Sequence, residues 1–176
     1  MLMVFCLIIL SCDDGTTDNS FCHRYEEGRI LVGMNENVSI EQSFDLANGY
    51  DLGVESVFGH YYESGLPGDS IQYVVDYLNS KDYINSHGFR AVEGGSVYLH
   101  HQTQVLTVLC NLWDMTTERQ HDWIETKSIL NLTERPGTKS LVLIVPNGQE
   151  KELVTAFEDL EDVKYAGLNC IMKITN

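Results

Sequence analysis

Histidine, cysteine and carboxylate side chains are the groups with which this chain could perform acid–base, nucleophilic or metal chemistry. The usual catalytic motifs are absent: there is no Gly-x-Ser-x-Gly elbow, phosphate-binding loop, His-Glu-x-x-His or Cys-x-x-Cys. His100 and His101 are adjacent on a predicted strand, so their side chains point to opposite faces and are poorly placed to share a metal ion. Cys110 lies in an apolar run, where burial raises the pKa of a thiol and makes it inert. We therefore expect no enzymatic activity, no cofactor and no metal site.

A different chemistry is expected of a cysteine that follows an apolar run at the start of the chain. Residues 1–10 are almost wholly apolar, are too short to span a bilayer and are typical of a secretory signal peptide. Residues 9–12, Ile-Leu-Ser-Cys, resemble the lipobox of bacterial lipoproteins, at which the signal peptide is cut and the cysteine is lipidated. The resemblance implies a mature chain that begins at Cys12 and is anchored in a membrane by acyl chains, each buried methylene contributing about 0.8 kcal/mol. The alternative is a buried N-terminal strand that places Val4, Leu7 and Ile9 in a core.

The segment after Cys12 is polar and small, as expected of a flexible tether. Asp13 and Asp14 directly after the cysteine resemble the export signals of surface lipoproteins in some Gram-negative groups. We therefore expect a protein of the cell envelope, at the outer membrane or the cell surface. The predicted organisation is a signal peptide over 1–11, a tether over 12–27 and a single domain over 28–176.

The charge of the chain limits its partners. The sequence has 26 acidic and 11 basic residues and a formal net charge of −15, which makes nucleic acid and anionic lipid surfaces poor partners. Cys22, Cys110 and Cys170 would remain after processing, an odd number in an oxidising compartment. One disulfide is possible, and the sequence leaves its pairing open.

Two strand–helix–strand patterns lie at the ends of the predicted domain. Ser39 and Gln42 have capping-box spacing, which predicts the start of the first helix. In the last strand Val163, Tyr165 and Gly167 are expected on one side. The expected elements are strands over 29–34 and 52–58 around a helix from Val38 to Gly49, and strands over 140–145 and 162–174 around a helix over 149–160.

Two such units with both helices on one face of an antiparallel sheet give the ferredoxin-like layout. We therefore predict an α+β fold with a ferredoxin-like core and a large helix–hairpin–helix insertion over residues 60–138, which is too apolar to be a linker. The expected features of the insertion are a helix over 69–79 with Asp69 and Gln72 in capping positions, a hairpin over 89–110 with its bend at Gln102 and Thr103, and a helix that Thr117 and Gln120 cap and that carries Trp123, Ile124 and Leu130.

The two ends also resemble a known family in sequence. Residues 28–34, Gly-Arg-Ile-Leu-Val-Gly-Met, followed by a helix that begins near Val38, are similar to the first strand and helix of the propeptide-type domain of subtilisin-like proteases. Residues 160–169 are similar to that family's Asp-Val-x-Tyr-Ala-Glu-Pro-Asn strand, with Gly167 replacing the glutamate and Leu168 replacing the proline. Such domains also occur as free inhibitors and as modules of bacterial surface proteins.

The resemblance implies a sheet that packs on a protease and a C-terminal tail that enters the protease cleft as an extended strand. Residues 170–176 would be that tail, and no protease domain follows them in the sequence, so an intact zymogen is not expected. Replacement of the family's glutamate by Gly167 weakens the docking of the tail. The candidate inhibitory residues are Tyr165, Asn169, Lys173 and Asn176.

Tyrosines gather at the start of the predicted insertion and form a candidate binding surface for a protein or glycan ligand, because tyrosine offers a large contact area with a polar group. The alternative is that these rings pack the insertion onto the sheet. We therefore predict a non-enzymatic binding or interaction module, with inhibition of a subtilisin-like serine protease as the alternative. The residues of the candidate surface are Tyr61, Tyr62, Tyr73, Tyr77 and Tyr83.

Overall fold

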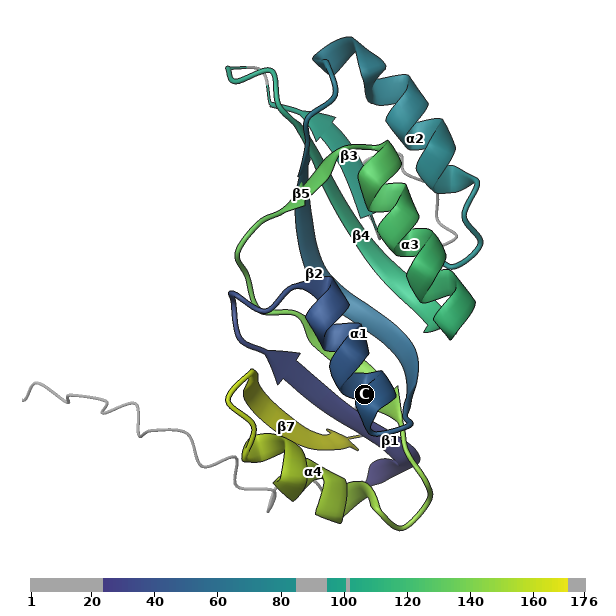
Figure 1. Cartoon of the computed structure of the whole chain (residues 1–176), viewed down its shortest axis with the longest axis vertical. Helices are drawn as coiled ribbons and strands as arrows, with labels where there is room; N and C mark the ends of the chain where they lie inside the picture. The colour runs from purple at the N-terminus through teal and green to yellow at the C-terminus, as the bar shows by residue number, and fades with distance from the viewer. Residues whose placement is uncertain (1–23, 85–94, 101, 171–176) are drawn as a thin grey trace, which may run out of the picture.

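The computed structural model describes residues 24–84, 95–100 and 102–170. Within this part of the chain the fold is α+β, as predicted, with one antiparallel sheet and helices on one of its faces (Figure 1). The elements are β1 (Tyr25–Met34), α1 (Ile40–Gly49), β2 (Gly53–Ser64), the 3-10 helix η2 (Gly68–Ser70), α2 (Ile71–Asn79), β3 (Gly95–Leu99), β4 (Leu106–Met115), α3 (Thr117–Ile129), β5 (Leu132–Glu134), β6 (Ser140–Ile144), α4 (Glu150–Glu158) and β7 (Val163–Cys170).

The long strand β2 joins two halves of the sheet. Its first part pairs with β6 and its last part pairs with β5, while β4 accompanies it along the other side. The strand order is β3-β4-β2-β6-β1-β7, with β5 also beside β2, and every pair is antiparallel. β2 therefore belongs to both halves.

The two halves have the same strand order. We call β1, β6, β7 and the first part of β2, with α1 and α4, the outer half. The last part of β2 with β3, β4 and β5, together with α2 and α3, is the central half. The order across the outer half is β2-β6-β1-β7, and the order across the central half is β3-β4-β2-β5. When the strands of each half are numbered along the chain, both orders are second, third, first, fourth. Figure 1 shows the central half above the outer half, with the helices of both on the near side of the sheet.

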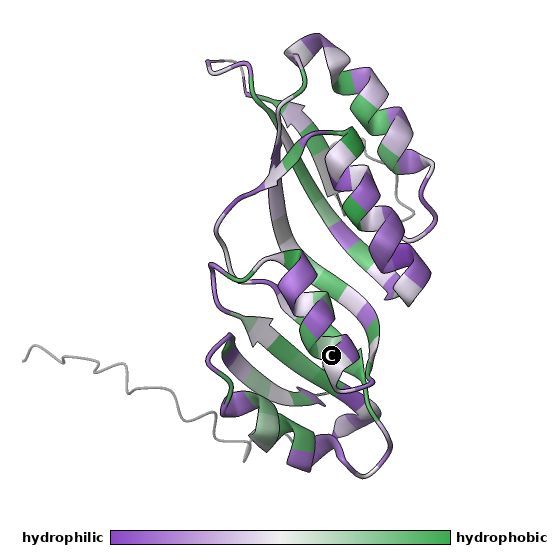
Figure 2. Cartoon of the chain, viewed as in Figure 1, coloured by the Kyte–Doolittle hydropathy of each residue, from purple (hydrophilic) through white to green (hydrophobic). Residues whose placement is uncertain are grey.

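One hydrophobic core runs through both halves. Ile30, Val32 and Met34 of β1 are buried beneath the helices, as expected for alternate residues of a strand. In the central half the buried ring of Trp123 lies edge-on to Tyr62, with 5.6 Å between ring centroids. Hydrophobic residues run along β1 and β4 behind the helices (Figure 2).

Polar contacts between α1 and α3 fix the two halves to each other. Asn48 of α1 donates a 2.9 Å hydrogen bond to Gln120 of α3, and Lys127 of α3 forms a 2.6 Å ion pair with Glu41 of α1. The halves are therefore parts of one packed structure.

Local signals predicted some helix starts and missed others. The capping box of Ser39 and Gln42 is confirmed, with both hydrogen bonds present. The predicted caps at Asp69 and Gln72 are wrong, because a 3-10 turn runs directly into α2 and no side chain caps it. The cap of α3 is Thr116, whose hydroxyl accepts a hydrogen bond from the Arg119 N–H, one residue earlier than predicted.

One boundary and the facing of one strand also differ from the expectation. The predicted tether extended to residue 27, but β1 begins at Tyr25. In β7 a register shift against β1 separates Val163 from Tyr165, so Val163 is buried while Tyr165 and Gly167 face away from the helices. The predicted single side for these three residues is therefore wrong, because a bulge interrupts the alternation. The turn at residues 147–148 and the bend at 102–103 are where they were predicted.

Candidate functional site

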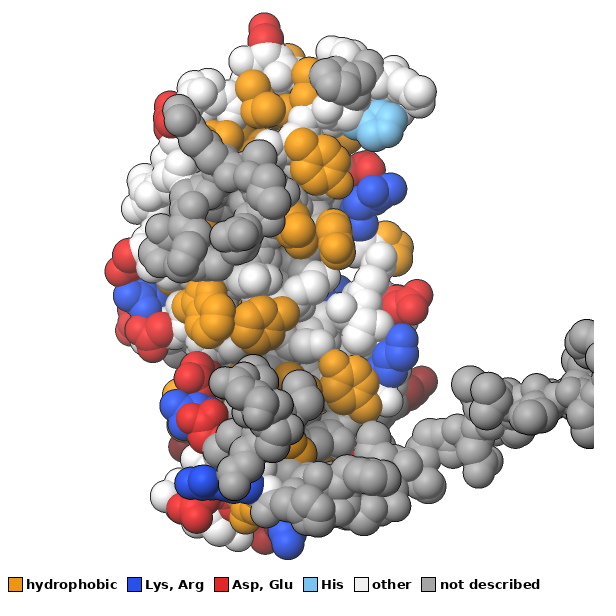
Figure 3. All heavy atoms as spheres, turned by 180° about the vertical axis from the view of Figure 1, so that it is seen from behind, with side chains coloured by type: hydrophobic (Ala, Val, Ile, Leu, Met, Phe, Trp, Pro, Cys, Tyr) orange, Lys and Arg blue, Asp and Glu red, His pale blue; other side chains and the backbone are white. Residues whose placement is uncertain are grey.

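The face of the sheet that points away from the helices is the main candidate site, and we call it the open face. Cross-strand partners share a face, and the partners Ser56 and Trp113, Tyr61 and Leu109, and Tyr98 and Thr107 point to this side. No helix of the described residues covers it. Seen from behind, apolar side chains gather in several groups over the sheet, and charged side chains lie along both margins (Figure 3).

Four large apolar side chains on the open face are well exposed. Their exposed fractions are 46% for Tyr61, 44% for Tyr98, 40% for Trp113 and 48% for Ile144. On an antiparallel sheet with one solvated face, outward positions are normally polar. Aromatic residues at these positions therefore indicate a surface that makes contacts.

A bulge in β2 decides which aromatic residues reach the open face. Between Val57 and His60, two residues of β2 stand opposite one residue of β4, and Gly59 has a φ of +81°. Strict alternation would put residues 58 and 61 on opposite faces, but the extra residue brings both Phe58 and Tyr61 to the open face. Glycine is required at the bulge, because a Cβ there would lie 2.9 Å from the Thr138 carbonyl oxygen.

Two aromatic contacts order the side chains of the open face. The rings of Phe58 and Trp113 lie edge-to-face at 5.2 Å. At the outer end, the ring of Tyr165 lies against Gly33, where any Cβ would clash with it, and its hydroxyl is 2.7 Å from Ser140 Oγ. These rings are held in place, so less side-chain entropy is lost when a partner binds.

The charges near the open face are paired. Arg29 forms ion pairs with Glu26, at 2.9 Å, and with Glu55. Arg135 forms a 3.2 Å ion pair with Glu63. The face therefore carries several apolar groups with paired charges beside them, although the chain as a whole is strongly acidic.

The structure does not bring the five predicted tyrosines together on one surface. Tyr61 lies on the open face, whereas Tyr73 and Tyr77 lie on α2 on the helix side, with their ring centroids 6.0 Å apart. Tyr62 and Tyr83 are buried against Trp123, so for these two the packing alternative holds. Trp113 and Tyr98 were not predicted from the sequence. The signal that could have identified them is their alternation with the apolar residues Leu112, Val97 and Leu99.

The other predicted site residues are only partly described. Tyr165 and Asn169 lie in β7, and the Asn169 amide donates a 3.1 Å hydrogen bond to Glu26. Lys173 and Asn176 of the candidate tail, and the candidate lipidation site Cys12, lie outside the described residues.

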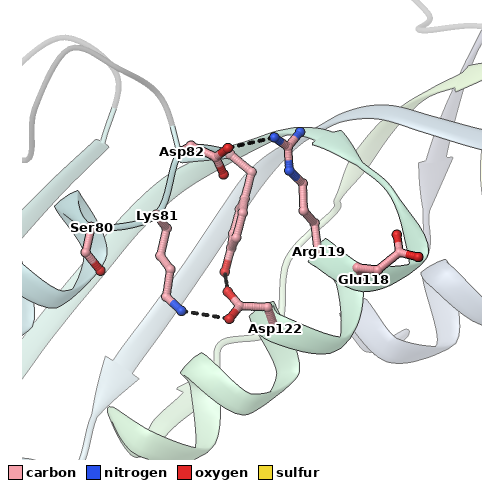
Figure 4. A pocket seen from close by; sticks show the side chains of 7 residues that line it. Ser80, Lys81, Asp82, Glu118, Arg119 and Asp122 are labelled. Carbon is pink, nitrogen blue, oxygen red and sulfur yellow. Dashed lines mark hydrogen bonds and ion pairs between the residues drawn. The ribbon is translucent and has the colours of Figure 1, made fainter.

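A second candidate is an open pocket of about 360 Å³ between the end of α2 and the start of α3 (Figure 4). Its cations are paired: Lys81 with Asp122 at 2.8 Å, and Arg119 with Asp82 at 2.8 Å. The Tyr83 hydroxyl donates a hydrogen bond to the second oxygen of Asp122. The lining residues are Ser80, Lys81, Asp82, Tyr83, Glu118, Arg119 and Asp122.

The protonation states in this pocket fit a structural role. Burial and the hydrogen bond to Asp122 raise the pKa of the Tyr83 hydroxyl. Burial favours the neutral form of Asp122, but hydrogen bonds from Lys81 and Tyr83 outweigh it and lower the pKa of this carboxyl. A general base needs a pKa near the working pH, and neither group has one. The cluster therefore clamps the segment after α2 onto α3.

The described cysteines differ in state. Cys110 is a free thiol, and burial raises its pKa, so it is a poor nucleophile. Cys170 is disulfide-bonded. In residues 24–84, 95–100 and 102–170 no group of three His, Cys, Asp or Glu side chains is arranged to hold a metal ion. None of the helices in the same ranges is long and apolar enough to cross a membrane.

Comparison with known proteins finds no family model, no curated protein and no solved structure that matches this chain.

Proposed function

We propose that this chain is an exported, lipid-anchored binding module of a bacterial cell envelope, and that it binds a protein partner on the open face of its sheet. The observation that carries the proposal is the presence of three exposed aromatic residues on that face, Tyr61, Tyr98 and Trp113. An apolar centre with charged and polar groups around it is the usual anatomy of a protein interface. Tyrosine and tryptophan are also the residues in which binding energy concentrates.

The proposal includes a ferredoxin-like layout in the outer half, with the central half inserted between its second and third strands. The strand order β2-β6-β1-β7 and the packing of α1 and α4 on one face support it. The central half has the same order with α2 and α3, so the layout would occur twice with β2 in common. Within the described residues, the helices of both units lie on the other face of the sheet, and the partner would bind the face opposite to them.

Export and anchoring are supported by two separate observations. The lipobox-like sequence at residues 9–12 lies outside the described residues and is a signal of the sequence alone. The disulfide at Cys170 is typical of an oxidising compartment, such as the periplasm or the cell surface. Mass spectrometry of the mature N-terminus tests the anchor directly, with a diacylated or triacylated Cys12 as the expected result and an unmodified Met1 as the contradicting one.

The binding function is tested by photo-crosslinking in the native cells. We would replace Tyr61, on the open face, by p-benzoylphenylalanine in the full chain, and Tyr73, on α2, as the matched control. Both tyrosines are exposed, with fractions of 46% and 50%. We expect a discrete protein adduct from position 61 and none from position 73. No adduct at position 61, or a glycan adduct, would contradict a protein partner on this face.

The second candidate function is inhibition of a subtilisin-like serine protease, which the resemblance of residues 28–34 and 160–169 favours. In that family the sheet packs on the protease, and here the open face is available for such a contact. We expect the intact chain to inhibit subtilisin and a chain ending at Cys170, which retains the disulfide-bonded residue, to lose inhibition. An intact chain that leaves proteolysis unchanged would rule out this candidate.

A further inference from the structure

Cys170, the last residue of β7, has a disulfide partner that can be identified by elimination. Cys110 is the other cysteine in the part of the chain that the structure describes, and it is free and buried. The bond at Cys170 therefore does not involve Cys110. The remaining cysteines of the sequence are Cys6, Cys12 and Cys22, which lie outside the described residues.

The strand register selects among these three cysteines. Cys170 stands directly opposite Tyr25 in the antiparallel pair of β1 and β7. Cys22 precedes Tyr25 by three residues, a distance of about 10 Å in an extended chain. A disulfide needs Cα atoms about 4.4–6.8 Å apart, which is within the reach of such a segment. Cys12 and Cys6 would have to close longer segments against β7, and longer closures cost more entropy.

We propose that Cys22 and Cys170 form a disulfide that fastens the segment before β1 to the end of β7. The assignment rests on the proposed function in two respects. Lipidation converts the sulfur of Cys12 into a thioether and signal cleavage removes Cys6, which leaves Cys22. Export also brings both thiols to a compartment that holds an oxidant.

The bond forms by thiol–disulfide exchange. The two thiols lose two protons and two electrons, the bond forms between the two Sγ atoms, and a disulfide-bonded oxidant is reduced to a dithiol. β7 pairs only with β1 among the described strands, so the bond secures an edge strand of the sheet. It also encloses almost the whole domain in one covalent loop, which restricts the unfolded chain.

The pairing is tested by peptide mapping of the full chain, purified from cell envelopes without reductant and alkylated before digestion. Trypsin cuts after Arg24, Lys164 and Lys173. We expect the peptide ending at Arg24 to be linked to the peptide 165–173, with fragmentation placing the bond on Cys22. A bond on Cys6 or Cys12 would overturn the pairing, and so would a Cys170 that is alkylated both in this sample and in chain refolded with glutathione.

Two variants and a refolding control sharpen the test. Cys22→Ser releases the peptide 165–173 with an alkylated Cys170 and lowers the melting temperature by about 5–15 °C, whereas the control Cys110→Ser keeps the linked pair. The same map is made on chain refolded in oxidised and reduced glutathione. A linked pair after refolding but free thiols in the envelope sample would support the pairing and overturn export.

Discussion

The carboxylate of Glu150 shows how one buried residue holds the start of a helix. Its two oxygens accept hydrogen bonds from the backbone N–H groups of Gly28 and Gly148, both at 2.8 Å. The bond from Gly28 is the largest of the effects that lower the pKa of this carboxyl below its ordinary value. The ionised group therefore ties β1 to the turn before α4.

The pH dependence of stability follows from that lowered pKa. Because the folded-state pKa is below the unfolded value of about 4.3, ionised Glu150 stabilises the fold above that pH, and the effect is lost as the pH falls through the folded-state pKa. We expect Glu150→Gln to lower the free energy of unfolding at pH 7 and to have a smaller effect at pH 3. Urea unfolding at both pH values measures this, with Glu152→Gln, at an exposed neighbour, as the control. An equal loss at pH 7 and pH 3 would contradict the role of the charge.

At the residue scale, the sequence could predict which residue types make contacts but not always their direction. Tyr61 and Tyr62 are adjacent, so a strand must send them to opposite faces, and the direction of each depends on the bulge at Gly59. A glycine in a strand indicates a bulge or a close approach of another backbone. The strand opposite the bulge, β4, is distant in sequence, so the sequence does not show where the bulge falls in the pairing. The division of the tyrosines between the core and two surfaces could therefore not be predicted.

The link between β5 and β6 is the element on which the joining of the two halves depends. Lys139, whose side chain is 3% exposed, forms a 2.8 Å ion pair with Glu134, and its ammonium also donates to the Val38 carbonyl. Glu134 in turn accepts a 3.1 Å hydrogen bond from the N–H of Ile40, the first residue of α1. This buried pair connects β5 of the central half with the start of α1 in the outer half.

Removal of Lys139 leaves the Lys127 ammonium, 3.7 Å away, as the remaining counter-ion of the buried Glu134 carboxylate. We expect Lys139→Met to lower the free energy of unfolding by about 3 kcal/mol. Lys164→Met is the matched control, because Lys164 forms an exposed 3.6 Å pair with Glu36, and such pairs contribute about 0.5 kcal/mol or less. Chemical denaturation measures both variants. Similar losses for the two would show that the junction does not depend on the buried pair.

At the element scale, local signals predicted some features correctly and others not. The capping box of α1 and the turn before α4 are encoded within a few residues, and both are confirmed. On one side, the first part of β2 pairs with β6 and the last part pairs with β5. This pairing joins residues far apart in the chain, and no local pattern indicates it. The hairpin bend at Gln102 was predicted, but the shared strand β2 was not.

For the whole molecule, the central claim is that one face of a continuous sheet is kept free for a partner. Four α-helices cover the other face within the described residues. The exposed apolar residues of the open face come from both halves, with Tyr98 in the central half and Ile144 in the outer half. A partner that contacts both would therefore bind across the shared strand β2.

The most direct test of this claim measures the yield of the adduct formed at position 61 when the open face is altered. We would combine Trp113→Lys with Tyr98→Lys, and use Ile129→Lys on the helix side as the control, since Ile129 is 38% exposed. We predict that the open-face pair reduces the adduct about tenfold, equivalent to about 1.4 kcal/mol, while the control leaves it unchanged and all variants remain folded. An undiminished adduct in the folded open-face variant would contradict the claim.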